Sequence, residues 1–364
     1  MGFRCGIVGL PNAGKSTLFN ALARTAVAAQ SYPFCTIEPN VGMVPVPDPR
    51  LEALAAIARP ARVVPAGVTF VDVAGLVAGA SRGEGLGNRF LGHIREVEAI
   101  AHVVRCFESE GVAHVGGRVD PAADIETIDT ELMLADIDVV ERHLERVEKS
   151  ARAGGREVRE RAAAFRRVAR HLGEGRPART LALEPKEAGV VRELSLLTAK
   201  PVMLVANVGE EDGFEDNPLL DAVRAAAAGE DARVVPICAA IEAELVTLDP
   251  EGQREFLADL GLEEPGLGRF VQAGYELLGL RTFFTADAKE ARAWTVRTGS
   301  AAPEGAGRIH TDFERGFIRA EVVAYDDFVA NGGEQGAKDA GRWRLEGRDY
   351  VIAEGDVIRF RFNV

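Results

Sequence analysis

The sequence predicts an α/β fold that carries a helical insertion and a smaller α+β domain at its C-terminal end. Short apolar runs rich in β-branched residues alternate with helical stretches, which is typical of buried parallel strands. About 95 residues separate two of these runs, which is too many for one crossover connection. The pattern changes again after residue 280. At roughly 150 residues per domain, a chain of 364 residues allows two or three domains.

The expected sheet has five strands, each followed by a loop with polar or glycine residues. These strands cover residues 3–8, 67–73, 101–107, 201–207 and 233–238.

The long gap before the fourth strand has the composition of helices. Residues 124–170 are rich in Ala, Leu, Glu and Arg and contain no Pro, and a second helical segment follows at 185–197. We therefore expect an inserted helical hairpin over about 124–197, with its turn at Gly154 and Gly155.

The last part of the chain is expected to form a compact domain of its own. Residues 320–325 and 350–364 are predicted strands, separated by glycine-rich turns. The final strand alternates, with Ile358, Phe360, Phe362 and Val364 on one face and Arg359, Arg361 and Asn363 on the other. Such alternation predicts a half-buried strand. The predicted domains are thus 1–280, which includes the insertion, and 281–364.

Composition and charge indicate a cytoplasmic protein. The four cysteines are widely spaced and form no CxxC pair, which argues for reduced thiols and against a zinc site or disulfide framework. No signal peptide or membrane span is expected. A formal charge of −13 disfavours indiscriminate binding to nucleic acid. Residues 141–180 nevertheless hold twelve Arg or Lys against six Asp or Glu, so they form either a polyanion contact or a solvated helix face.

The strongest motif is the run GLPNAGKS at residues 9–16, which matches G-x-x-x-x-G-K-[ST]. It follows the first expected strand and precedes an apolar helix, which is the context that a P-loop requires. Backbone N–H groups and the helix dipole would surround the phosphates. Lys15 would reach the β and γ phosphates, and the Ser16 hydroxyl would bind Mg²⁺. The motif predicts a P-loop nucleoside triphosphatase.

Two further loops fit this interpretation. Asp72 and Gly75 belong to a D-x-x-G motif after the second strand, where Asp72 would hold Mg²⁺ through water and the Gly75 N–H would contact the γ-phosphate. Thr36 could complete the Mg²⁺ shell as a switch threonine, although a Thr that caps a surface turn is the alternative. Four glycines within residues 79–88 suggest a second switch or an ordinary flexible loop.

The loop after the fourth strand bears on the choice of base. Asn207, Val208 and Glu210 occupy the positions of the guanine-reading motif N-K-x-D. Val208 cannot cover the ring as Lys does, and Glu210 is one methylene longer than Asp. Since hydrogen-bonding sites discriminate steeply, these changes favour adenine. Cys238 ends the next strand, where a second base loop usually lies.

The hydrolytic residue is less obvious from the sequence. Leu76 stands where many GTPases place a water-orienting Gln. Either another residue replaces that Gln, or turnover is slow and a partner completes the site. His114, in a glycine-flanked loop, could act on the attacking water, or it could have no such role. Asn12 in the P-loop is a candidate ligand for a K⁺ ion.

Together these motifs resemble the YchF/Obg-like ATPase family, translation-factor-related P-loop proteins of the TRAFAC class. The resemblance also rests on PFCT at 33–36, DVAGLV at 72–77, IHTDFERGF at 309–317 and FRF at 360–362, and it covers essentially the whole chain. It implies a Ras-like G domain, a coiled-coil insertion and a C-terminal TGS domain of β-grasp shape.

The resemblance also implies site residues. It places Mg²⁺ on Ser16 and Thr36 and catalysis on His114. The implied phosphate contacts are Asn12, Ala13, Gly14, Lys15, Ser16 and Thr17. The implied adenine contacts are Asn207, Val208 and Glu210.

The expected function is therefore a switch that hydrolyses ATP to ADP and phosphate. Ribosome association, with the large subunit or the whole ribosome, is implied by the resemblance alone. Neither a membrane nor specific DNA is an expected partner. The alternatives are a GTPase with relaxed base specificity, a metabolic P-loop kinase, and a nucleotide-binding regulatory module with little catalysis of its own.

Overall fold

The computed structural model describes residues 3–28, 40–73, 86–109, 114, 117–151, 155–211, 213–214, 217–230 and 232–363. The chain divides into two compact units. The first consists of Met1–Thr25, Ile37–Gly42 and Thr69–Phe270, and the second of Ala26–Thr36, Met43–Val68 and Val271–Val364.

The first sheet has six strands in the order β2-β4-β1-β5-β6-β7. Their bounds are β1 Arg4–Val8, β2 Val41–Pro45, β4 Gly67–Asp72, β5 Ala99–Cys106, β6 Val202–Val208 and β7 Arg233–Ile237. The pairs that join β4, β1, β5, β6 and β7 are all parallel, so the five predicted strands form one parallel sheet. Strand β2 was not predicted, because its five residues include Gly42 and Pro45, which are unfavourable in strands.

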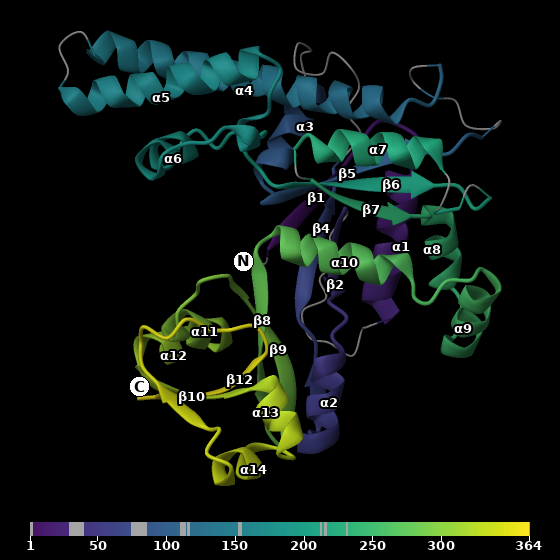
Figure 1. Ribbon diagram of the computed structural model, residues 1–364, viewed down its shortest axis with the longest axis vertical. Coiled ribbons are helices and arrows are strands. Elements are labelled where there is room, and N and C mark those ends of the chain that lie inside the picture. The colour runs from purple at the N-terminus through teal and green to yellow at the C-terminus, as the bar shows by residue number, and fades with distance from the viewer. Residues whose placement is uncertain are drawn as a thin grey trace. The chain divides into compact units, whose positions relative to one another are not determined.

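Helices cover both faces of this sheet, with α7 on one side and α1 on the other (Figure 1). The helices outside the insertion are α1 Lys15–Ala28, α3 Leu86–Arg95, α7 Pro218–Ala228, α8 Ala239–Leu245, α9 Pro250–Asp259 and α10 Gly266–Leu277. Strands β5 and β6 are buried at every position. The phosphate loop follows β1, in the middle of the sheet, at the edge where parallel α/β sheets bind ligands.

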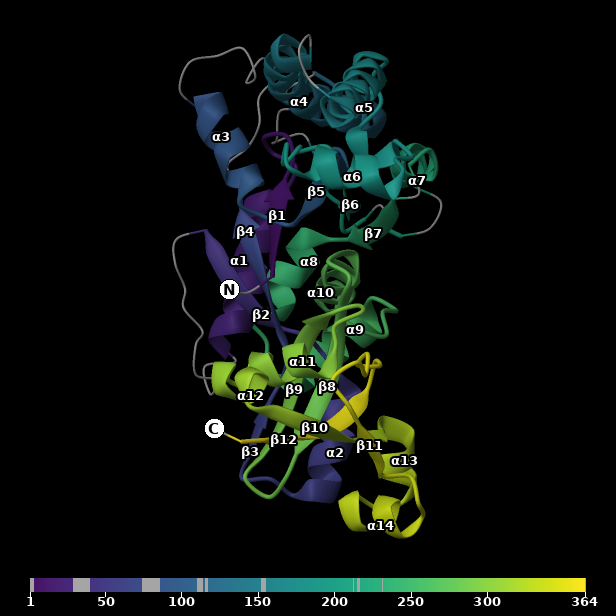
Figure 2. The ribbon, with the colours of Figure 1, turned by 90° about the vertical axis from the view of Figure 1, so that its left-hand side faces the viewer.

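The predicted helical insertion is confirmed. It consists of α4 Pro121–Ala151, α5 Arg156–Gly173, a short 3₁₀ helix Ala178–Thr180 and α6 Pro185–Arg192. Both ribbon views show α4 and α5 side by side (Figures 1 and 2). Val140, Phe165 and Val168 are at most 1% exposed in the core between them. Gly155 caps the N-terminus of α5, and Gly154 lies outside the described residues.

The second unit contains a sheet in the order β11-β10-β12-β8-β9-β3. Its strands are β3 Arg62–Val64, β8 Leu280–Ala286, β9 Glu290–Arg297, β10 Phe317–Ala324, β11 Arg344–Glu346 and β12 Asp356–Phe362. Its helices are α2 Pro49–Ala58, α11 Ala302–Ile309, α12 Thr311–Arg315, α13 Tyr325–Ala330 and α14 Glu334–Asp339. Strands β3, β8, β9 and β11 were not predicted, and the boundary expected at residue 280 stays a prediction.

The prediction for the last strand was partly wrong. Strand β12 begins at Asp356 rather than near residue 350. Ile358 and Phe360 are buried as expected, but Phe362 is 37% exposed. Phe362 lies at the end of the strand, where its ring stacks on Phe313 of α12 at 3.7 Å between centroids instead of entering the core. Val364 lies outside the described residues.

A search of the described helices for a membrane-spanning segment found none of sufficient length and apolarity.

Candidate nucleotide site

The loop between β1 and α1 packs so closely that two of its residues must be glycine. A Cβ on Gly9 would lie 2.3 Å from the carbonyl oxygen of Val103, and a Cβ on Gly14 would lie 2.1 Å from Nδ2 of Asn207. Gly14 also has a φ of +93°, which side chains rarely adopt. Asn12 has a φ of 62°. The loop therefore has the tight backbone geometry that the P-loop motif predicts.

Lys15 and Asp72 place opposite charges beside this loop. The Lys15 side chain is buried, and its Nζ donates a hydrogen bond to the Leu10 carbonyl at 2.7 Å. Burial lowers the pKa of Lys15, and the nearby carboxylate of Asp72 opposes that change. Burial raises the pKa of Asp72, which Lys15 opposes in turn. These two groups are poorly solvated and are suited to a charged ligand.

One oxygen of Asp72 carries a second signal. Its Oδ1 is buried and has no hydrogen-bond partner within the part of the chain that the structure describes. A buried acceptor without a partner is costly, so a ligand that donates to it is favoured. Water bound to Mg²⁺ is such a donor, and the site therefore fits the predicted metal.

Asn207 ties three segments of the site together. Its Nδ2 donates to the Ala13 carbonyl at 3.0 Å, and its Oδ1 accepts from the backbone N–H of Ala239 at 2.9 Å. The side chain is 4% exposed and lies near the end of β6. The phosphate loop, the end of β6 and the start of α8 are thereby held in one arrangement.

A cavity of about 380 Å³ opens beside these bonds. It is lined by Gly14 and Thr17 and by residues 107–109, 207–211 and 238–240. Glu210 is exposed and Val208 is 2% exposed. The structure thus brings Gly14 and Thr17 of the predicted phosphate residues and the predicted base loop to one cavity. Residues 107–109 were missed, although their place directly after β5 puts them at the same edge of the sheet.

The remaining P-loop residues lie where the motif puts them. Ala13 is buried in the loop, and Ser16 and Thr17 are exposed in the first turn of α1. Thr36, Gly75 and Leu76 lie outside the described residues, as does most of the glycine-rich stretch 79–88.

His114 lies against the first turn of α4. Its Nε2 is 3.0 Å from Oδ2 of Asp124, and both side chains are 7% exposed. Burial raises the pKa of Asp124, and the hydrogen bond with His114 opposes that change. The sequence did not reveal Asp124, because nine residues, two of them glycines, lie between it and His114.

Two family models match this chain. Residues 4–144 match a model described as a 50S ribosome-binding GTPase, and residues 280–363 match a YchF-type C-terminal model described as a protein of unknown function (DUF933).

Curated relatives and a solved structure match the chain over its full length. The "Ribosome-binding ATPase YchF" of Haemophilus influenzae is 58% identical over 364 residues, and that of Bacillus subtilis is 50% identical over 366, each covering 100% of both chains. The structure of the YchF GTPase of Schizosaccharomyces pombe is 36% identical, with a TM-score of 0.91, and covers 99% of this chain and 98% of that one. This chain therefore belongs to the YchF family.

Proposed function

We propose that this protein hydrolyses ATP to ADP and phosphate and works as a nucleotide-dependent switch that associates with ribosomes. The observation that carries the proposal is the cavity shared by Gly14 and Thr17 of the P-loop and residues 207–211. A phosphate cradle and a base loop that open into one cavity suit a nucleoside triphosphate. The relatives that match over the full length bear the names of ribosome-binding ATPases.

The phosphates are held by the P-loop and the start of α1. Backbone N–H groups from Asn12 to Thr17 face the phosphate oxygens, favoured by the helix dipole. Lys15 exchanges its hydrogen bond with the Leu10 carbonyl for phosphate oxygens, which better compensate a buried ammonium. Lys15 thereby stabilises the charge that develops during hydrolysis.

The metal site combines residues of the P-loop and of two switch segments. Ser16 and Thr36 would supply hydroxyl ligands, Asp72 would accept from metal-bound water, and the Gly75 N–H would contact the γ-phosphate. When bound, Mg²⁺ neutralises charge on the phosphates. Asn12 is the proposed ligand for K⁺, which would supply a further positive charge.

Adenine is the preferred base because Val208 and Glu210 cannot reproduce the Lys and Asp of the guanine-reading motif. Asn207 holds the loops that border the base site. GTP remains the second candidate substrate, since the family model over residues 4–144 is described as a GTPase.

His114 is the proposed residue that orients and activates the attacking water. If Nε2 donates its proton to Asp124, Nδ1 is left as the acceptor. The tautomer is then the one that a general base requires.

Phosphate release from ATP under single-turnover conditions tests this assignment. We expect Lys15→Ala to weaken ATP binding and abolish release. His114→Ala should lower the rate at least tenfold while ATP affinity changes less than threefold. Hydrolysis unchanged in both variants would overturn the proposed chemistry and leave a nucleotide-binding module.

Association with ribosomes supports a cytoplasmic location for this activity. The arm formed by α4 and α5 carries the basic segment 141–180 and is the proposed ribosomal contact.

A further inference from the structure

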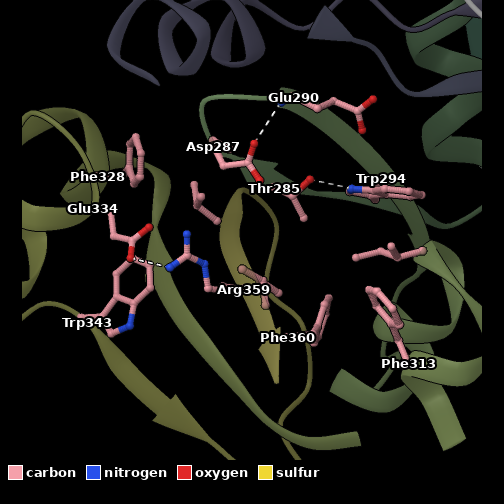
Figure 3. Close-up of a pocket in the computed structure, with 14 residues that line it drawn as sticks. Thr285, Asp287, Glu290, Trp294, Phe313, Phe328, Glu334, Trp343, Arg359 and Phe360 are labelled. Atoms are coloured by element: carbon pink, nitrogen blue, oxygen red, sulfur yellow. Dashed lines mark hydrogen bonds and ion pairs between the residues drawn. The ribbon is translucent and has the colours of Figure 1, made fainter. Parts of the chain in front are cut away.

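A second cavity, of about 250 Å³, lies within the second unit (Figure 3). Strands β8 and β12 pair in parallel through Phe284 and Val357. Both strands continue past this pair, and the residues that follow, 285–287 and 358–360, line the cavity together with residues from β9, α12 and α13.

Five of the fourteen residues that line the cavity are aromatic, and some of their rings are held in place by other side chains. The aromatic lining residues are Trp294, Phe313, Phe328, Trp343 and Phe360. The indole N–H of Trp294 donates to Oγ1 of Thr285 at 2.9 Å, as Figure 3 shows. The ring of Phe313 stacks on Phe362. Such rings present π faces to a ligand without much loss of side-chain entropy on binding.

The charged lining is acidic. Three carboxylates, on Asp287, Glu290 and Glu334, line the cavity with one guanidinium, on Arg359. Glu334 is well neutralised, because Arg359 and Lys338 lie 2.8 and 2.5 Å from its Oε1.

The two carboxylates at the β8–β9 turn are weakly paired. Glu290 has Arg62 and Arg292 at 3.8 and 3.7 Å, beyond the roughly 2.7–2.9 Å of a charge-assisted hydrogen bond. One oxygen of Asp287 accepts from the backbone N–H groups of Lys289 and Glu290, and its other oxygen has no hydrogen bond within the described residues. These two groups can therefore still bind a cation.

Aromatic ring faces beside carboxylates that lack close ion-pair partners favour a cationic ligand over an anionic one. Both tryptophans already stack with cations of this chain, since the Arg292 guanidinium lies 4.0 Å from the Trp294 ring centroid and the Lys338 ammonium 4.7 Å from that of Trp343. A cation over such a ring is attracted by the negative face of the ring.

We propose that this cavity binds an arginine side chain from a basic segment of a protein partner. A planar guanidinium can stack on an aromatic ring while its N–H fork binds the carboxylates of Asp287 and Glu290. Arginine fits better than lysine because an ammonium has no such fork or stacking plane. Binding of arginine in this cavity requires neither the nucleotide site nor ATP hydrolysis.

Tryptophan fluorescence reports on this cavity directly, because Trp294 and Trp343 are the only two tryptophans of the sequence. The full-length protein is titrated with a short capped peptide whose only charged residue is one central arginine, and with the same peptide in which citrulline replaces that arginine. We expect a saturable change in emission with the arginine peptide and at least tenfold weaker binding of the citrulline peptide.

Two conservative variants link the signal to the carboxylates. Asp287→Asn keeps an oxygen that can accept the turn N–H groups, and Glu290→Gln keeps the shape of the side chain. The double variant should bind the arginine peptide at least tenfold more weakly, with unchanged ATP affinity as the check on folding. Asp349→Asn, which alters an exposed carboxylate elsewhere in this unit, is the matched control and should bind normally.

Equal binding of both peptides, or no change in emission, would overturn the proposal. It would also be overturned if a single-stranded RNA oligonucleotide changed the emission at lower concentration than the arginine peptide, because the cavity would then recognise bases. Full peptide affinity in the double variant would exclude the carboxylates as the recognition groups.

Discussion

Asn207 uses both ends of its side-chain amide to hold two loops of the nucleotide site together. In Asn207→Ala, the Ala13 carbonyl and the Ala239 N–H lose their partner, each at a cost of about 1–3 kcal/mol. We expect ATP affinity, measured by calorimetry, to fall at least tenfold. Asn20→Ala, an exposed position on α1, should bind as the parent does. Unchanged affinity in Asn207→Ala would mean that the loops keep their arrangement without this bridge.

The buried side chain of His102 makes the free energy of unfolding depend on pH. It is buried in β5, and burial, assisted by the positive charges of Arg179 and Lys15, lowers its pKa from 6.5 to about 3. Below pH 6.5 the unfolded chain therefore binds a proton at His102 that the folded chain does not bind. The contribution of His102 to stability is thus lost progressively as the pH falls from about 6.5 towards 3.

Urea unfolding at pH 7 and pH 5 measures this effect. The parent should lose about 2 kcal/mol more between the two pH values than His102→Gln does. The quantity compared is the change in unfolding free energy between the two pH values in each protein. A destabilisation by the substitution that is the same at both pH values therefore does not affect the result. Equal pH dependence in both proteins would show that His102 is protonated in the folded state as readily as in the unfolded state.

The sequence predicts which residues belong to the nucleotide site better than it predicts the contacts between them. Lys15, Asp72 and Asn207 follow from motifs that end strands, and parallel strands bring such ends to one edge. The bridge from Asn207 to Ala13 and Ala239, and the pair of His114 and Asp124, depend on how loops pack in three dimensions, which no local pattern encodes.

Among the elements, α4 has a defined anchor to the parallel sheet. The carboxylate of Asp136, 1% exposed, accepts from the backbone N–H groups of Leu197 and Thr198, each at 2.8 Å, and from the Thr198 hydroxyl at 2.7 Å. The anchor ties the middle of the helix to the segment that leads into β6.

Asp136→Asn should destabilise the protein by about 3 kcal/mol, because the new amide places a donor against an N–H group that had an acceptor. Urea unfolding gives the change in free energy. Asp138→Asn, an exposed position on the same helix, is the control and should change stability by less than about 0.5 kcal/mol. A similar small change in Asp136→Asn would contradict the anchoring role.

The strands and helices that were predicted each have a residue pattern that is uniform along their length. The central strands are apolar throughout because both faces are covered, and the arm has a long run without Pro. Strands β8 and β9 carry Thr and Arg between apolar residues, so the change of pattern after residue 280 was visible while the strands themselves were not. In β9 the alternation of burial could have been recognised.

For the whole molecule, the basic surface of the arm carries a prediction about ribosomes. Arg159 and Arg170 of α5 are exposed and make no ion pair within the residues that the structure describes. Replacing both by Glu should weaken co-sedimentation with ribosomes at least tenfold and reduce its salt dependence, because contacts with phosphates would be lost. The experiment is done once with isolated large subunits and once with whole ribosomes, to identify which of the two the protein binds.

Arg254→Glu in α9 is the control for this charge reversal. Arg254 is exposed and lies outside the arm. If its reversal weakened ribosome binding as much, per charge, as the α5 double variant, net charge rather than the arm would explain the interaction.

The sequence could not predict which segments of the chain form the second unit. Residues 43–68 belong to it together with 271–364, and β3 pairs with β9 across more than two hundred residues of chain. Pairing at such separation leaves no local periodicity, and three residues are too few to show a strand pattern.

The preference of the site for adenine over guanine nucleotide can be measured by competitive titration. Nucleotide-free protein is titrated with fluorescent ATP and GTP analogues in Mg²⁺, and unlabelled nucleotides serve as competitors. We expect ATP to bind at least tenfold more tightly than GTP, a difference of about 1.4 kcal/mol. Equal affinities, or tighter binding of GTP, would contradict it, since the loop from Asn207 to Glu210 would then still read guanine.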